Sequence, residues 1–102
     1  MLNQVVLVGR LTKEIEEIEE GDKKKAYITL AVGRNYKNAD GIYENDFIPC
    51  MLWNGICDNV KDYCKKGDIL GVKGRIEVKD DKVIIVAEKV TFLSSKHNED
   101  EN

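Results

Sequence analysis

The chain has 102 residues, 42% of them hydrophobic, and a formal net charge of −3 at pH 7. This length suits one domain with a small core, and no apolar run approaches the roughly 20 residues of a membrane-spanning helix. The 3 cysteines form no Cys-x-x-Cys pair, and with 1 histidine they favour buried thiols in a reducing cytoplasm over a metal or redox site.

The N-terminal third predicts a strand followed by an acidic hairpin. Residues 4–12 are apolar and β-branched, with Gly9 inside, which predicts a strand with a bulge or a close backbone approach at the glycine. Residues 14–22 carry 6 acidic residues and no basic one. They fit either a helical turn or a hairpin through residues 20–22, and the hairpin is favoured because strands flank it on both sides.

Residues 26–53 predict two further strands. Residues 26–36 alternate between apolar faces, and residues 37–45 hold an Asp-Gly pair typical of a loop. Residues 45–53 form the next strand, in which successive side chains point to opposite faces. One face carries Phe47, Pro49, Met51 and Trp53, and the other carries Ile48, Cys50 and Leu52.

The next segment predicts the one helix of the chain. Residues 55–67 place apolar side chains at helical spacing, with Lys65 and Lys66 in the last turn and Gly67 just beyond it. Residues 68–79 return to strict alternation and predict a fourth strand, and residues 83–93 predict a fifth after a tight turn. The residues of the fourth strand expected to face the core are Leu70, Val72, Ile76 and Val78, and Gly74 among them predicts close packing.

The element order β-β-β-α-β-β predicts an all-β OB-fold. This fold is a five-stranded Greek-key barrel, here with one short helix between strands 3 and 4, and it binds oligonucleotides or oligosaccharides. Residues 1–93 are expected to form this domain. Residues 94–102 contain no core residue and predict a short, acidic, disordered tail.

Both faces of the strand at residues 45–53 are apolar, so only one of them can belong to the core. Phe47 and Trp53 lie on the same face, and its function has to be explained. At about 3.3 Å per residue they lie roughly 20 Å apart, which is the span of about three nucleotides of extended single strand. Each ring is able to stack a base, which contributes ~1–3 kcal/mol regardless of sequence. Alternatively, Trp53 closes the end of the barrel and Phe47 packs under a loop, and the spacing alone does not decide.

The fourth strand carries an outward basic row of Lys73, Arg75 and Lys79, interrupted by Glu77. Alternate residues lie ~6.6 Å apart, close to the phosphate spacing of an extended strand, but a solvated strand face explains the same row. No enzyme, cofactor or metal site is expected. The sole histidine, His97, lies in the tail, and no phosphate loop or dinucleotide motif is present.

Four stretches together resemble the successive blocks of a known family. They read VVLVGRLTKE, ITLAVGRNY, DFIPCMLWN and NVKDYCKKGDILGVKGRIEV, and in this order they are similar to the bacterial single-stranded DNA-binding proteins (SSB). The resemblance implies a cytoplasmic, nucleoid-associated OB-fold protein that assembles as a homotetramer, or as a dimer, and wraps single-stranded DNA in replication, recombination and repair.

The resemblance also implies which residues bind DNA. Tyr36, Phe47 and Trp53 fall on the family's stacking positions, and Lys79 falls on a basic position of its fourth strand. The other basic residues expected to contact phosphates, as candidates from this chain alone, are Arg34, Lys37, Lys73 and Arg75. Three features depart from the family: the short hairpin at residues 79–82, the acidic first hairpin, and a tail without the Pro-Phe end that recruits replication or repair proteins. They keep open an alternative, an SSB-like adaptor subunit of the primosomal-accessory type that acts mainly through protein contacts.

Overall fold

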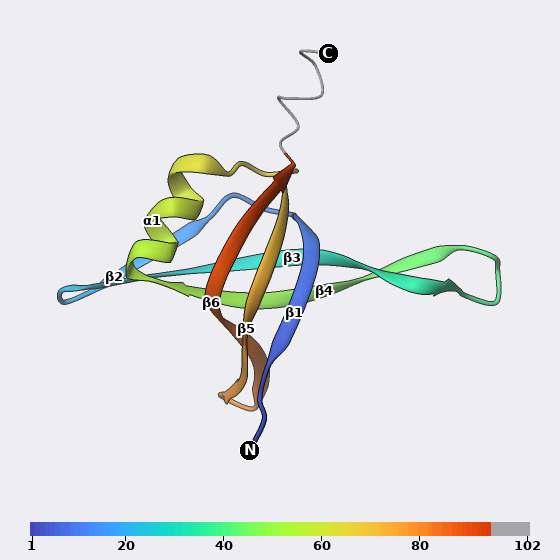
Figure 1. Ribbon diagram of the computed structural model, residues 1–102, viewed down its shortest axis with the longest axis horizontal. Helices are drawn as coiled ribbons and strands as arrows, with labels where there is room; N and C mark the ends of the chain where they lie inside the picture. The colour runs from blue at the N-terminus through green and yellow to red at the C-terminus, as the bar shows by residue number, and fades with distance from the viewer. Residues whose placement is uncertain (95–102) are drawn as a thin grey trace, which may run out of the picture.

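The computed structural model describes residues 1–94 as a twisted sheet with one helix (Figure 1). Its elements are β1 (Val5–Leu11), β2 (Glu16–Glu20), β3 (Lys23–Lys37), β4 (Tyr43–Trp53), α1 (Asn54–Tyr63), β5 (Ile69–Lys79) and β6 (Lys82–Ser94). In the described part, no helix has the length and apolar character to cross a membrane. The predicted tail lies, from residue 95 on, outside the described residues.

The sheet closes into a barrel. Its strand order is β1-β5-β6-β4-β3-β2, and β1 also pairs with β3, where Leu11 stands opposite Leu30. The pairs are antiparallel except β4–β6, which run parallel with Met51 opposite Val86. Strands β1, β5, β6, β4 and β3 therefore form a closed circuit, which confirms the five-stranded OB-fold. Strand β2 completes the hairpin expected at residues 20–22.

The core lies inside this circuit, where the inward residues of the alternating strands meet. The side chains of Leu11, Leu30, Leu52, Leu70, Val72 and Cys50 are fully or almost fully buried. Helix α1 packs Cys57 and Val60 into the same cluster and contacts β3, β4 and β6. Burying one such aliphatic side chain stabilises the fold by roughly 1.5–3 kcal/mol. A shift of register by one residue would move all of these side chains to the solvent face, so their alternation fixes which face of each strand points inward.

Two glycines allow strands to approach closely, as the sequence predicts. A Cβ on Gly9 would lie 2.8 Å from the carbonyl oxygen of Ala31, and a Cβ on Gly74 would collide with the carbonyl group of Val86. Because contacts this short displace backbone, neither position accepts a side chain without moving a strand.

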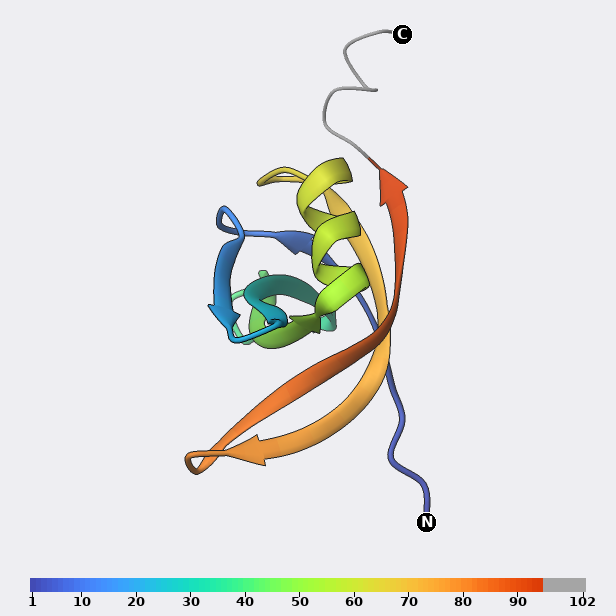
Figure 2. The ribbon, with the colours of Figure 1, turned by 90° about the vertical axis from the view of Figure 1, so that its left-hand side faces the viewer.

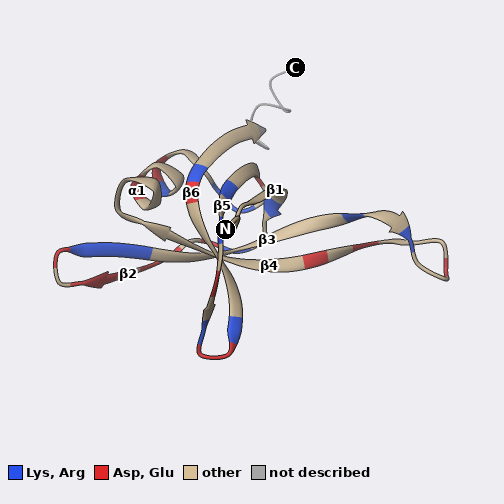
Figure 3. Cartoon of the chain, turned by 60° about the horizontal axis from the view of Figure 1, so that its bottom comes forward, with Lys and Arg blue, Asp and Glu red and all other residues tan. Residues whose placement is uncertain are grey.

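Several hairpins extend beyond the barrel, and one of them corrects a prediction. The β2–β3 hairpin, the β3–β4 arm and the β5–β6 hairpin project from the core (Figures 1 and 3), and Figure 2 shows the β5–β6 hairpin from the side. Ile76 and Val78, predicted to face the core with Leu70 and Val72, are 42% and 69% exposed. The core cluster reaches only as far as Ile85, opposite Ile76, and beyond it both Val78 and its partner Val83 are exposed.

The helix is shorter than predicted. It ends at Tyr63, so Lys65 and Lys66 lie outside its last turn. The carboxylate of Asp68 accepts the backbone N–H of Lys65 at 2.9 Å, and the N–H of Gly67 donates to the carbonyl of Leu11. These bonds close a turn against β1, and the positive φ of 99° at Gly67 serves that turn.

Candidate nucleic-acid interface

The outer faces of β3 and β4 form one continuous surface. In the antiparallel register Trp53 stands opposite Lys25, Met51 opposite Tyr27, and Phe47 opposite Ala31. Directly opposite residues share a face, so Tyr27 joins the apolar set predicted on β4. The opposite face of β4 is the core, which confirms the predicted division of this strand.

Three exposed aromatic residues lie on the β3–β4 arm. Phe47 is 65% exposed, and Tyr36 and Tyr43 are exposed to a similar degree. Tyr43 was not predicted, because residues 37–45 were assigned to a loop. Tyr43 is the first residue of β4 and, four residues before Phe47, it points to the same face of the strand. The Nζ of Lys37 lies 5.6 Å from the centroid of the Tyr43 ring. The arm therefore presents aromatic rings beside a cation, which suits base stacking.

Trp53 is half-buried. It packs with Tyr27 against a small cluster of Met51, Ile84 and Val86. The Nζ of Lys25 lies 5.8 Å from the Trp53 ring centroid and 6.0 Å from that of Tyr27. The structure thus gives Trp53 a packing role and leaves part of its surface open to solvent on the outer face.

Lys25 is itself paired with an acid. Its Nζ lies 3.2 Å from a carboxylate oxygen of Glu20, and this hydrogen bond raises the pKa of Lys25. Through the β2–β3 register, Glu16 and Ile18 face the same side as Tyr27 and Lys25. The acidic strand β2 therefore borders the Trp53 end of the surface (Figure 3), where it repels a polyanion.

The surface continues across β6 onto β5. Val86 and Ile84 stand opposite Arg75 and Glu77, so the outward row of β5 lies on the same side as the β4 aromatics. The Nζ of Lys79 donates to the Tyr27 hydroxyl at 3.4 Å, which brings the end of this row to the β3–β4 surface.

Arg34 and Arg75, both expected to bind phosphate, are engaged by carboxylates. Arg75 lies 2.7 Å from Glu77 and 3.2 Å from Glu88. Arg34 lies 2.7 Å from Asp46; this hydrogen bond raises the pKa of Arg34 and lowers that of Asp46. These carboxylates compete with a phosphate for the donors of both guanidinium groups.

Lys73 lies apart from the other predicted residues. It stands opposite Val6 of β1, and it lines a hollow of about 320 Å³ with Val8, Lys89 and Leu93. The structure brings together Phe47, Trp53, Arg75 and Lys79 on one face, and places Arg34, Tyr36 and Lys37 along the arm. Lys73 belongs to the β1 side of the sheet.

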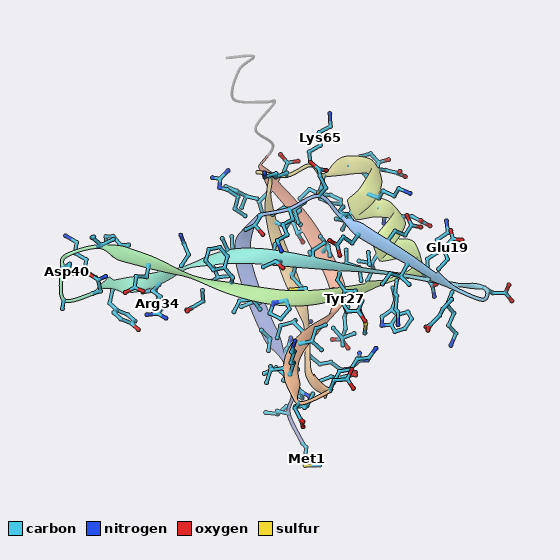
Figure 4. All side chains as sticks on the ribbon, turned by 180° about the vertical axis from the view of Figure 1, so that it is seen from behind. Met1, Glu19, Tyr27, Arg34, Asp40 and Lys65 are labelled. Atoms are coloured by element: carbon cyan, nitrogen blue, oxygen red, sulfur yellow. The ribbon has the colours of Figure 1, made fainter. Side chains whose placement is uncertain are left out.

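Tyr27, like Tyr43, is a residue of this surface that the sequence interpretation missed (Figure 4). The alternation of Tyr27 with the buried Ala26 and Ile28 did indicate that Tyr27 faces outward. Its contact with Lys79 joins residues 52 positions apart in the chain, and no local pattern predicts such a contact. Among residues 1–94 no group of three or more potential ligands is arranged to hold a metal ion.

Comparisons with known proteins agree with this geometry. The model of the Single-strand binding protein family matches residues 2–93. The chain is 44% identical to Single-stranded DNA-binding protein 3 of Listeria innocua, over 96% of this chain and 68% of that protein. It is 36% identical to Single-stranded DNA-binding protein 1 of Clostridium acetobutylicum, over 93% of this chain and 96% of that protein.

A solved structure has the same fold at low identity. The second single-stranded DNA-binding protein of Mycobacterium smegmatis superimposes with a TM-score of 0.75 at 18% identity, over 88% of this chain and 87% of that one.

Proposed function

The chain belongs to the single-strand binding protein family, and we propose that it binds and protects single-stranded DNA without sequence preference during replication, recombination or repair in the cytoplasm. The observation that carries this proposal is the exposed aromatic surface of β3 and β4, in which Tyr36, Phe47 and Trp53 lie outside the core. A role as an adaptor is not favoured, because the relatives are named for single-stranded DNA binding.

Base stacking is the proposed source of affinity along this surface. Every base has a π-face, so stacking on an aromatic ring contributes ~1–3 kcal/mol per base without reading its identity. Phe47 offers the most accessible ring on β4, and Trp53 offers the part of its ring that the small cluster leaves open. An extended strand that follows β4 passes both.

Phosphate contacts are assigned first to Lys37 and Lys79. Lys37 lies beside the Tyr43 ring and Lys79 beside the Tyr27 hydroxyl, so each holds its charge next to an aromatic group of the surface. Arg34 and Arg75 contribute only once a phosphate displaces their carboxylates. Lys73, on the β1 side, is a contact only for DNA that continues around the barrel.

Association with further copies, as a tetramer or a dimer, is proposed through β1. Along Val5–Gly9, β1 pairs with β5 on one edge, and within residues 1–94 its pairing with β3 is confined to Arg10 and Leu11. The rest of that edge is open, and Val6 beside it is 69% exposed. An open edge next to exposed apolar side chains favours pairing with another copy.

Titration with oligo-dT, observed through tryptophan emission, tests the function. Trp53 is the 1 tryptophan of the chain, so quenching by oligo-dT places DNA at this surface. Duplex DNA of equal phosphate content is the control and should leave the emission unchanged. Trp53→Phe, which retains the packing better than alanine, should weaken binding at every salt concentration. Failure of the unmodified protein to retain any single strand would refute the proposal.

A further inference from the structure

We propose that the hollow between the β3–β4 surface and the tip of the β5–β6 hairpin is a subsite for one nucleotide of the single strand, with the base inside and its phosphate between Lys79 and Lys82. This inference rests on the proposed function and adds a position that neither Phe47 nor Trp53 supplies.

The shape of the hollow suits one base. Its volume is about 300 Å³, at the lower end of the ~300–1,000 Å³ of small-molecule pockets. Its apolar walls come from Tyr27 and Pro49 on one side and from Val83 and Ile84 on the other, and Lys79, Asp80 and Lys82 complete the lining. The interior is therefore mostly apolar, with the Tyr27 ring as the aromatic wall on which a base can stack.

Two lysines and one aspartate, Asp80, line the rim of the hollow, so its charged residues sum to +1. Lys79 and Lys82 stand directly opposite each other at the end of the hairpin, and like charges in this position destabilise a strand pair. Asp80 and Asp81 join them through a turn in which both residues have positive φ, 51° and 64°, which is the conformation of a type I′ turn. A phosphate bound between the two ammonium groups removes their repulsion.

The hollow is continuous with the stacking surface. Tyr27 stands opposite Met51, and Pro49 lies on the same face as Phe47, so a strand that crosses β4 passes the opening. The Lys79–Tyr27 contact holds the hairpin against β3. The short hairpin thus encloses a tyrosine of β3 and brings two lysines to it.

The phosphate half of the proposal is tested by a matched pair of charge reversals. Lys82→Glu and Lys65→Glu change the net charge equally, and Lys65 lies at the opposite end of the molecule from the hairpin (Figure 4). For a short oligo-dT at low salt, Lys82→Glu should weaken binding at least about tenfold, and Lys65→Glu less than about threefold. Lys82→Ala should flatten the log–log salt slope by about 0.7.

The base half is tested with an abasic oligonucleotide that has the same number of phosphates. The unmodified protein should bind oligo-dT more tightly than the abasic strand, and Tyr27→Ala should reduce this ratio about tenfold, from the lost stacking of one base. Tyr27→Phe should keep the ratio, since it retains the ring. Tyr63→Ala, which removes an exposed tyrosine of α1, is the matched control and should also keep it.

Pro49→Glu gives a test that does not depend on the folding of Tyr27→Ala, because Pro49 is exposed, lines the hollow and lies on the same outer face as Phe47. It should weaken oligo-dT binding as Lys82→Glu does. Unchanged binding by both Lys82→Glu and Pro49→Glu, while the unmodified protein still binds oligo-dT, overturns the subsite and leaves the proposed function intact. No binding of oligo-dT by the unmodified protein overturns both.

Discussion

Arg34 and Asp46 form a two-pronged ion pair on the β3–β4 arm. The Nε of Arg34 lies 3.2 and 3.1 Å from the two carboxylate oxygens, and its Nη2 lies 2.7 Å from Oδ1. This geometry is the one that a guanidinium also offers to a phosphate. The carboxylate of Asp46 therefore competes with DNA for the same donors.

Removal of this competitor should strengthen DNA binding. Asp46→Asn is expected to tighten oligo-dT binding at low salt and to steepen the log–log salt slope by about 0.7, because Arg34 becomes available to one phosphate. Glu44→Gln is the control, since Glu44 lies 3.9 Å from Arg34 and is the weaker partner. Weaker binding by Asp46→Asn would show instead that Asp46 positions Arg34 for the DNA.

The same pair predicts a pH dependence of stability. Its hydrogen bond to Arg34 holds the pKa of Asp46 below its ordinary value. A carboxylate with a lowered folded pKa stabilises the fold above the unfolded pKa of about 4, and this contribution is lost as the pH falls through the folded value. Urea midpoints of the protein and of Asp46→Asn should therefore differ at pH 7 and converge as the pH falls through the lowered pKa of Asp46. A constant difference across this range would contradict the pairing.

Lys79 and Arg75 should respond differently to removal. Three phosphate contacts predict a parent salt slope of about −2. Lys79→Ala should flatten it by roughly 0.7, whereas Arg75→Ala should change it less, because Glu77 and Glu88 already neutralise Arg75. Oligo-dT affinities over a salt series measure both slopes. Equal flattening by the two variants would mean that DNA displaces both glutamates.

The three thiols should be inert in the native protein. Burial raises the pKa of Cys50 to about 12, and burial with the nearby Asp68 raises that of Cys64 to about 11. Cys57 is buried too, and its pKa is also raised, chiefly by burial. Because the thiolate is the nucleophile, iodoacetamide at pH 8 should label these positions only as the protein unfolds. Rapid labelling of the folded protein would contradict the buried positions.

The open edge of β1 predicts a test of assembly. Light scattering at micromolar concentration should give a dimer or a tetramer, and Val6→Lys should lower the mass, because it places a charge on the exposed apolar side of the edge strand. Val78→Lys, an equally exposed valine of the β5–β6 hairpin, is the control and should keep the parent mass. A parent protein that is monomeric would exclude association through β1.

The alternation of the strands made most of the fold predictable. Leu70 and Val72 were correctly expected inside, the two faces of residues 45–53 were correctly divided, and the element order sufficed for a closed OB-fold. The helix was found, but its end was not, because Asp68 and Leu11 bind the segment after Tyr63 and no local pattern records a contact with β1. Ile76 and Val78 were misplaced for a similar reason, since alternation continues in a hairpin that has left the barrel.

The sequence by itself determined which residues are aromatic, basic and outward-facing, because a period of two is a local property of the chain. It therefore identified Phe47 and Lys79 as candidates for DNA binding, and the resemblance to the family added Tyr36. Only the tertiary structure decided which charges are available, since the ion pair of Arg34 with Asp46 and the contact of Lys79 with Tyr27 join different strands. Contacts between strands depend on register and barrel closure, and these are fixed by the packing of the whole core.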